Sequence, residues 1–255
     1  MMNINEILNV ATYAGKIMLE SGAEAYRVEE TINNISRAYG IEAPDSYATP
    51  TVIISSANHE DELRSVVVRI KKRSVDLDKI HKVNDLSRNI LNKNYSIKEL
   101  KEKLENIENE IRYSKFLTIL CGAFGAFGFV YLFNGSFNDS IAAFFIGLVV
   151  KYVDLKASKI GINSFFVTVL CSIVVALLTI FMIKINIADN MDIVIISALM
   201  LLVPGLAITN AIRDTIAGDL VSGIARGLEA FLTALAVAVG TGVVLNFFIS
   251  SFGGL

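Results

Sequence analysis

Long apolar runs in the second half of the chain constrain its fold most strongly. A helix needs roughly 20 residues to cross the ~30 Å of hydrocarbon in a bilayer. Candidate spans occur at residues 116–133, 140–153, 160–183, 193–212 and 230–250. The second is marginal, because its apolar part ends at Val150 and reaches the interface only if Lys151 and Lys156 extend toward the headgroups. The runs predict an α-helical polytopic membrane protein with about five transmembrane helices.

Charged residues are concentrated before these runs. Residues 1–113 hold 16 of the 23 Lys and Arg residues and 18 of the 25 Asp and Glu residues. We therefore expect a cytoplasmic α+β domain at 1–95, an amphipathic connector helix at 96–115 and a transmembrane domain at 116–255. The net charge of −2 and the lack of a one-sided basic cluster argue against nucleic acid as a partner.

Sequence periodicity predicts the elements of the N-terminal domain. Apolar positions recur at helical spacing in residues 4–39, with a break at Ser21 and Gly22, and again in residues 75–91. Residues 47–57 and 63–70 are rich in β-branched residues and predict a β-hairpin. In the connector, Ser96 and Glu99 have the spacing of a capping box.

Four charged residues surround the predicted break between the first two helices: Glu20, Glu24, Arg27 and Glu29. They form either a charged seam against the membrane part or a solvated helix face, and we favour the solvated face. His59 lies beside three acidic residues at 60–62, but no second histidine is nearby. We expect neither a metal nor a cofactor.

The distribution of basic residues predicts the orientation. The loops at 134–139 and 184–192 carry one basic residue between them, whereas Lys156 and Lys159 flank the second connection and the N-terminal part is rich in Lys and Arg. The positive-inside rule then places the N-terminus in the cytoplasm and the C-terminus outside. If the second run is re-entrant, the C-terminus moves to the cytoplasmic side.

Residues 204–229, PGLAITNAIRDTIAGDLVSGIARGLE, place a helix breaker and five charges between apolar segments. An ionisable group in hydrocarbon costs roughly 2.5 to 3.5 kcal/mol on insertion scales, so such charges normally face a protein cavity or the interface. Pro204 and Gly205 can interrupt a helix and free backbone carbonyls, as in transporter binding sites. The alternative is a kinked span followed by a charged cytoplasmic loop.

Several polar strings resemble the threonine/serine exporter family: EILNVATYAGKIMLESGAEAYRVEETI near the N-terminus, YATPT at 47–51, RxVDLxKIxxVNDLSR from Arg73, and PGLAITNAIRDTIAGDLVSGIARGLEA from Pro204. The resemblance implies an inner-membrane exporter of threonine, serine or a dicarboxylate such as succinate, driven by an ion gradient. Single-chain members continue into a further set of helices. The resemblance is therefore closest to the first component of the split, two-gene form, and implies a small multi-pass membrane partner supplying the C-terminal half.

The family pattern also implies site residues. We expect the substrate to contact Pro204, Gly205, Asn210, Arg213, Ser222 and Arg226, ion coupling to use Asp214 and Asp219, and Gly218 and Gly223 to permit close backbone approach. An arginine suits a carboxylate substrate because its planar fork binds both oxygens. Besides the partner and its substrate, we expect contact with membrane lipid, and a homo-oligomer is compatible with this interpretation.

Two alternatives remain open. One is a membrane-tethered hydrolase using His59, Asp61, Ser55 and Ser56, although no nucleophile elbow or HExxH motif is present. The other is a regulatory or scaffold subunit of a channel formed by the partner. We favour a transporter over an enzyme.

Overall fold

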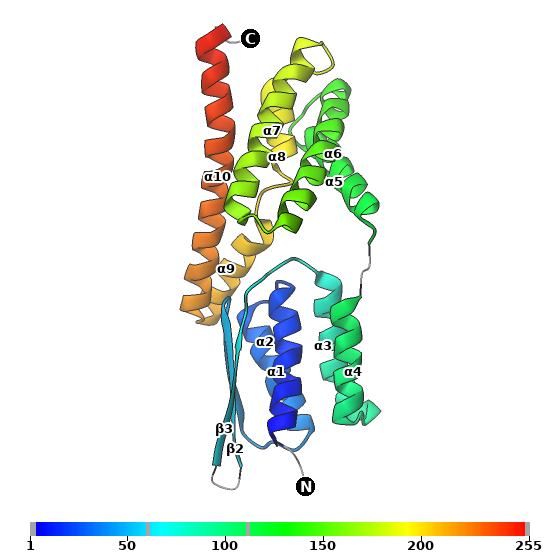
Figure 1. Ribbon diagram of the computed structural model, residues 1–255, viewed down its shortest axis with the longest axis vertical. Helices are drawn as coiled ribbons and strands as arrows, with labels where there is room; N and C mark the ends of the chain where they lie inside the picture. The colour runs from blue at the N-terminus through cyan, green and yellow to red at the C-terminus, as the bar shows by residue number, and fades with distance from the viewer. Residues whose placement is uncertain (1–3, 60–61, 111–112, 253–255) are drawn as a thin grey trace. The chain divides into compact units, whose positions relative to one another are not determined.

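The computed structural model describes residues 4–59, 62–110 and 113–252 (Figure 1). The chain divides into two compact units. The first unit comprises Met1–Glu110 and Gly205–Leu228, and the second comprises Ile111–Pro204 and Glu229–Leu255. A segment from the apolar half of the sequence therefore belongs to the same unit as the charged N-terminal half.

Helices and a small sheet build the first unit. Its elements are α1 (Ile4–Glu20), α2 (Ala25–Ala38), β1 (Pro44–Thr49), β2 (Val52–His59), β3 (Glu62–Arg69), α3 (Leu77–Lys93), α4 (Ile97–Asn109), α9 (Gly205–Ala217) and the first turns of α10 (Leu220–Phe252). The sheet is antiparallel in the order β1-β2-β3. Buried residues of α1 to α4 and of β1 and β2, such as Leu19, Ile32, Ile53 and Leu104, share one hydrophobic core.

The predicted hairpin is a three-stranded meander. Residues 47–57 do not form one strand, because the chain turns at Pro50 and Thr51 and Thr49 pairs with Val52. Proline explains the turn, since its fixed φ suits a turn and it has no N–H to donate to a neighbouring strand.

Local signals elsewhere in this unit are confirmed. Gly22 separates α1 from α2 with a left-handed φ of 95°, and a Cβ there would lie 3.1 Å from the Ser74 carbonyl oxygen. The predicted capping box forms at Ser96 and Glu99 at the start of α4. The buried face of α4, which includes Leu104, packs into the common core, so this helix helps to build the first unit.

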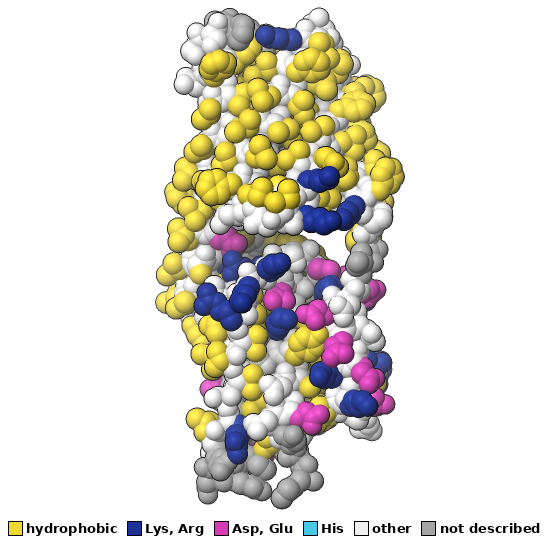
Figure 2. All heavy atoms as spheres, viewed as in Figure 1, with side chains coloured by type: hydrophobic (Ala, Val, Ile, Leu, Met, Phe, Trp, Pro, Cys, Tyr) yellow, Lys and Arg dark blue, Asp and Glu magenta, His cyan; other side chains and the backbone are white. Residues whose placement is uncertain are grey.

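The second unit is helical in its described part: α5 (Lys115–Leu132), α6 (Phe137–Ile160), α7 (Ser164–Lys184), α8 (Met191–Leu199) and the remainder of α10. Among the described residues, three helical segments are long and apolar enough to cross a membrane: Lys115–Leu132, Ser164–Lys184 and Leu220–Ser251. Figure 2 shows hydrophobic side chains over the visible face of this unit. Exposed aromatic residues such as Phe124 and Phe166 are typical of a surface that faces lipid or another membrane protein.

The predicted fourth span, residues 193–212, forms two helices instead of one. α8 ends at Leu199 and α9 begins at Gly205, directly after Pro204. The predicted break at the Pro-Gly pair is thus confirmed. The nine residues of α8 rise only about 14 Å, which is short of the hydrocarbon thickness. The helix that follows the break belongs to the first unit.

Candidate functional site

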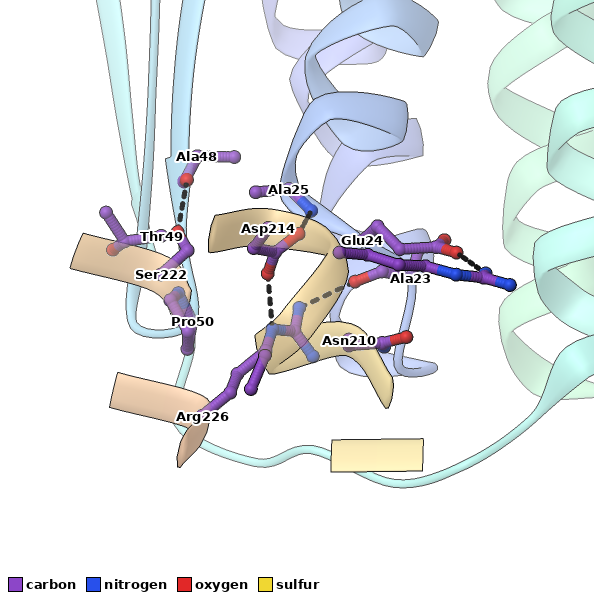
Figure 3. Close-up of polar contacts among 12 residues, drawn as sticks. Ala23, Glu24, Ala25, Ala48, Thr49, Pro50, Asn210, Asp214, Ser222 and Arg226 are labelled. Atoms are coloured by element: carbon purple, nitrogen blue, oxygen red, sulfur yellow. Dashed lines mark hydrogen bonds and ion pairs between the residues drawn. The ribbon is translucent and has the colours of Figure 1, made fainter. Parts of the chain in front are cut away.

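The polar residues of α9 and of the first turns of α10 meet the turn between α1 and α2 and the end of β1 (Figure 3). A sharp turn brings the two helices together, because Gly218 has a left-handed φ of 96° and the Asp219 N–H donates to the Asp214 carbonyl oxygen at 2.8 Å. This is a common way for a helix to end. The α9–α10 hairpin, residues 205–228, therefore presents both helices to the α1–α2 turn.

Gly223 allows the two helices of the hairpin to approach closely. A Cβ at this position would overlap Thr215 Oγ1 and would lie 3.0 Å from the Ala211 carbonyl oxygen. The close backbone approach that we predicted at Gly223 is thus made to α9. Gly218 forms the exposed end of that helix.

Asp214 and Arg226 form a buried ion pair at the centre of the site. The distance from Arg226 Nε to Asp214 Oδ2 is 2.9 Å, and the side chains are 6% and 0% exposed. The contact does not have the geometry of a directed hydrogen bond between these two atoms. Burial raises the pKa of Asp214, whereas the Ala25 N–H and the Arg226 charge oppose the increase.

Asp214 and Arg226 each also bind a backbone group of the α1–α2 turn. Arg226 Nη2 donates to the Ala23 carbonyl oxygen at 2.6 Å, and Asp214 Oδ1 accepts from the Ala25 N–H at 3.1 Å (Figure 3). Asn210 adds a third contact, because its Nδ2 donates to the Gly22 carbonyl oxygen at 2.8 Å. Three of the predicted site residues therefore bind backbone atoms of this turn.

Glu24 links the turn to Arg213. Its two carboxylate oxygens lie 2.6 Å from Arg213 Nη1 and 3.4 Å from Arg27 Nη1, while its side chain is only 6% exposed. Burial favours the neutral acid, but hydrogen bonds from its own backbone N–H and from Arg213, with the Arg27 charge, hold the pKa of Glu24 below its usual range. Glu24 thus belongs to a charged seam, and the solvated face that we favoured is wrong for this residue.

A pocket of about 330 Å³ lies beside these contacts. Its lining residues are Gly22, Glu24, Arg27, Leu77, Ile80, His81, Leu206, Asn210 and Arg213. Arg213 retains 57% exposure of its side chain despite its ion pair. Two guanidinium groups, one carboxylate and an amide can together bind a small polar molecule that carries a carboxylate.

Ser222 and Glu29 both form a hydrogen bond with the backbone of Ala48 on β1. Ser222 Oγ donates to the Ala48 carbonyl oxygen at 3.2 Å, and the Ala48 N–H donates to Glu29 Oε1 at 2.7 Å. Burial raises the pKa of Glu29 to about 7, and the nearby negative charges of Asp219, Asp45 and Asp214 add to the effect, against the Ala48 N–H. We did not assign Glu24 or Glu29 to the site from sequence, although both lie in a segment that carries the family resemblance.

The remaining predicted residues are Pro204, Gly205 and Asp219. Pro204 belongs to the second unit and Gly205 is exposed at the start of α9, while Asp219 is partly exposed in the hairpin turn. Of the alternative hydrolase residues, Ser55 is buried on β2, and Asp61 lies outside the described residues, as does Glu60. Within the described ranges, no three His, Cys, Asp or Glu side chains are grouped to hold a metal ion.

Comparison with known proteins identifies the family of the chain. The family described as "Putative threonine/serine exporter" matches residues 9–248. A "Probable succinate transporter subunit YjjP" of Klebsiella aerogenes is 22% identical over 88% of this chain and 86% of its own length. The protein of the same description in Escherichia coli K12 is 22% identical over 94% of both chains.

A "Probable threonine/serine exporter" of Mycobacterium tuberculosis is also 22% identical, over 94% of this chain but 46% of its own length. No solved structure matches the chain. The family match includes the α1–α2 turn, β1 and the α9–α10 hairpin, which together build the site. The chain belongs to the threonine/serine exporter family, a family of transporters and not of enzymes.

Proposed function

We propose that the chain is a subunit of an inner-membrane exporter for a small carboxylate-bearing metabolite, driven by an ion gradient. Threonine, serine and a dicarboxylate such as succinate are the candidate substrates, because the family and the relatives carry these names. The observation that carries the proposal is the pocket with two guanidinium groups beside the buried polar contacts of the α9–α10 hairpin.

Arg213 is our candidate for the group that receives the substrate carboxylate. It lines the pocket together with Asn210, and its side chain is more than half exposed. A guanidinium binds a carboxylate through two parallel N–H groups, so an incoming carboxylate can compete with Glu24 for Arg213. Arg27, which contacts the other oxygen of Glu24, then remains to balance the Glu24 charge.

The buried pair has a different role in this proposal. The Arg226 guanidinium contacts Ala23 and Asp214, so it supports the pocket by holding the α1–α2 turn. Asp214 and Asp219 remain the candidates for ion coupling. Asp214 lies in the last turn of α9, and Asp219 lies in the turn between α9 and α10. Ser222 anchors the hairpin to β1.

A membrane partner completes the proposed exporter. The word "subunit" in the names of two relatives supports a second component. Exposed apolar side chains of the second unit, such as Phe166 and Phe247, supply a surface that a helical membrane protein can cover. We keep the predicted orientation, with the N-terminus in the cytoplasm, so that the first unit receives the substrate from the cell interior.

Efflux from cells that lack their own exporter tests the function. The cells carry this gene with or without its genomic neighbour, and are loaded with labelled threonine, serine or succinate. We expect efflux only with both components, and loss of efflux for Arg213→Ala at unchanged abundance. Arg88→Ala, at an exposed position of α3, is the matched control and should retain efflux. Full efflux by Arg213→Ala would instead favour the regulatory or scaffold role.

A further inference from the structure

Glu29 connects three elements of the site through one residue of β1. Its side chain extends from α2 and accepts the Ala48 N–H at 2.7 Å, while the Ala48 carbonyl oxygen accepts the hydroxyl of Ser222 from α10. On the α2 side, the Ser46 hydroxyl also donates to the Glu29 carbonyl oxygen at 3.3 Å. A change in the Glu29 carboxylate therefore acts directly on the attachment of β1 to both helices.

Negative groups face Glu29 from each neighbouring element. Asp45 lies on β1, Asp214 on α9 and Asp219 in the hairpin turn, and all three raise its proton affinity. The positive charge of Arg226 lies 2.9 Å from Asp214. Half-buried among carboxylates, Glu29 gains a proton at a pH at which an exposed glutamate remains ionised.

We propose that Glu29 is the proton-binding residue of this site and that its protonation controls how firmly the α9–α10 hairpin is held against β1. The inference rests on the proposed function and deepens it, because it names the coupling ion as a proton and adds a residue to Asp214 and Asp219. One proton from the aqueous phase converts the carboxylate to the acid, which removes its repulsion with Asp214 and Asp219. Release of that proton to water restores the repulsion and loosens the hairpin.

The sign of the effect on stability follows from the direction of the shift. The pKa of Glu29 is about 7 in the folded chain, compared with 4.5 as its ordinary value. Between these two values the folded state binds more protons than the unfolded state, so stability falls as the pH rises through this window. Substitution by Gln, which stays neutral, removes this dependence.

Three variants test the inference: Glu29→Gln, Glu29→Asp and the control Glu30→Gln. Glu30 is the next residue of the same helix but is exposed. Efflux by the full chain with its partner, and thermal unfolding of the purified full chain, are measured from about pH 5 to about pH 8.5. We expect the pH dependence near neutrality to disappear in both measurements for Glu29→Gln, and to remain as in the wild type for Glu30→Gln.

The outcomes separate this inference from the proposed function. Absence of efflux by the wild type with its partner would overturn the proposed function. If Glu29→Gln keeps the wild-type pH profile in both efflux and thermal unfolding, the role of Glu29 is overturned and the proposed function is not. If Glu29→Gln does not accumulate, Glu29→Asp decides, because it still titrates but is too short to keep the Ala48 contact. A displaced pH midpoint then supports the inference, and a wild-type midpoint overturns it.

Discussion

Asp214 on α9 and Arg226 on α10 place their charged atoms 2.9 Å apart, and each also binds the backbone of the α1–α2 turn, at Ala25 and Ala23 respectively. Glu24 lies between these two contacts in the sequence and directs its own carboxylate to Arg213. A charge pair within the α9–α10 hairpin thus fixes the position of an acidic residue that lines the pocket. This relationship gives the most direct test of the site.

Single substitutions in the buried pair should abolish efflux. Arg226→Lys keeps the charge but cannot contact Ala23 and Asp214 in the two-pronged geometry of arginine. Asp214→Asn removes the carboxylate that contacts Arg226 in a buried site, and breaking such a pair costs about 3 to 5 kcal/mol. Efflux and abundance should both be measured, with Glu42→Gln, at an exposed position, as the control.

A double substitution separates stability from transport. Replacing both charges, as in Asp214→Leu with Arg226→Met, leaves neither charge of the pair in the buried site, so the loss of stability should be smaller than the sum of the single losses. Efflux should remain absent, because the contacts to the α1–α2 turn are gone. Wild-type efflux by the double variant would show that the pair has no role in transport.

Local signals in the sequence were sufficient to predict the interruptions of the chain. The breaks at Gly22 and after Pro204, and the capping box at Ser96, each depend on residues that are adjacent or within one turn. The turn at Pro50 was missed because β-branched residues on both sides suggested a single strand. The residues of the hairpin were predicted to belong to a site from the family pattern and from their charge.

The partners of these residues were not predictable in the same way. Arg226 contacts Ala23, and Asp214 contacts Ala25, at sequence separations of 203 and 189 residues. Alanine carries no side-chain signal for such a contact, because its backbone groups form the bonds. Glu29 was likewise hidden, since only the folded sheet brings Ala48 and the carboxylates of the hairpin to it.

Two glycines on α10 provide a matched test of the close helix contact. Gly223→Ala should destabilise the hairpin and reduce efflux, because the added Cβ overlaps Thr215 and approaches the Ala211 carbonyl oxygen. Gly227→Ala adds the same methyl group four residues later, where the nearest atom is 4.0 Å away. It should be neutral or slightly stabilising. Equal abundance and efflux for both variants would contradict the packing of α9 against α10.

Asp139 supports the second unit and should be sensitive to loss of its charge. It is fully buried, and Oδ1 accepts the backbone N–H groups of Asp189 and Asn190 at 2.8 and 2.9 Å. Asp139→Asn replaces part of this acceptor set with a donor, and hydrogen bonds to a charged group contribute about 1.5 to 3 kcal/mol each. The abundance in the membrane and the temperature of thermal unfolding should both fall. Asp192→Asn, at an exposed position on α8, should leave both unchanged.

The shared unit of α1 to α4 and the α9–α10 hairpin limits the membrane topology. With the N-terminus in the cytoplasm, five crossings place a reporter fused after Leu255 on the outer side, as the distribution of basic residues predicts. Because the hairpin belongs to the same unit as α1 to α4, the chain between Glu110 and Gly205 must cross the membrane an even number of times. Four crossings, by α5, α6, α7 and the segment with α8, meet this condition, and so do two crossings, by α5 and α7 alone; both keep the C-terminal reporter outside. Reporters in the loops at 161–163 and 186–189 decide, because four crossings place them inside and outside, respectively, and two crossings reverse both. A reporter before α1 should signal in the cytoplasm in either case, and an outer signal there would contradict the whole orientation.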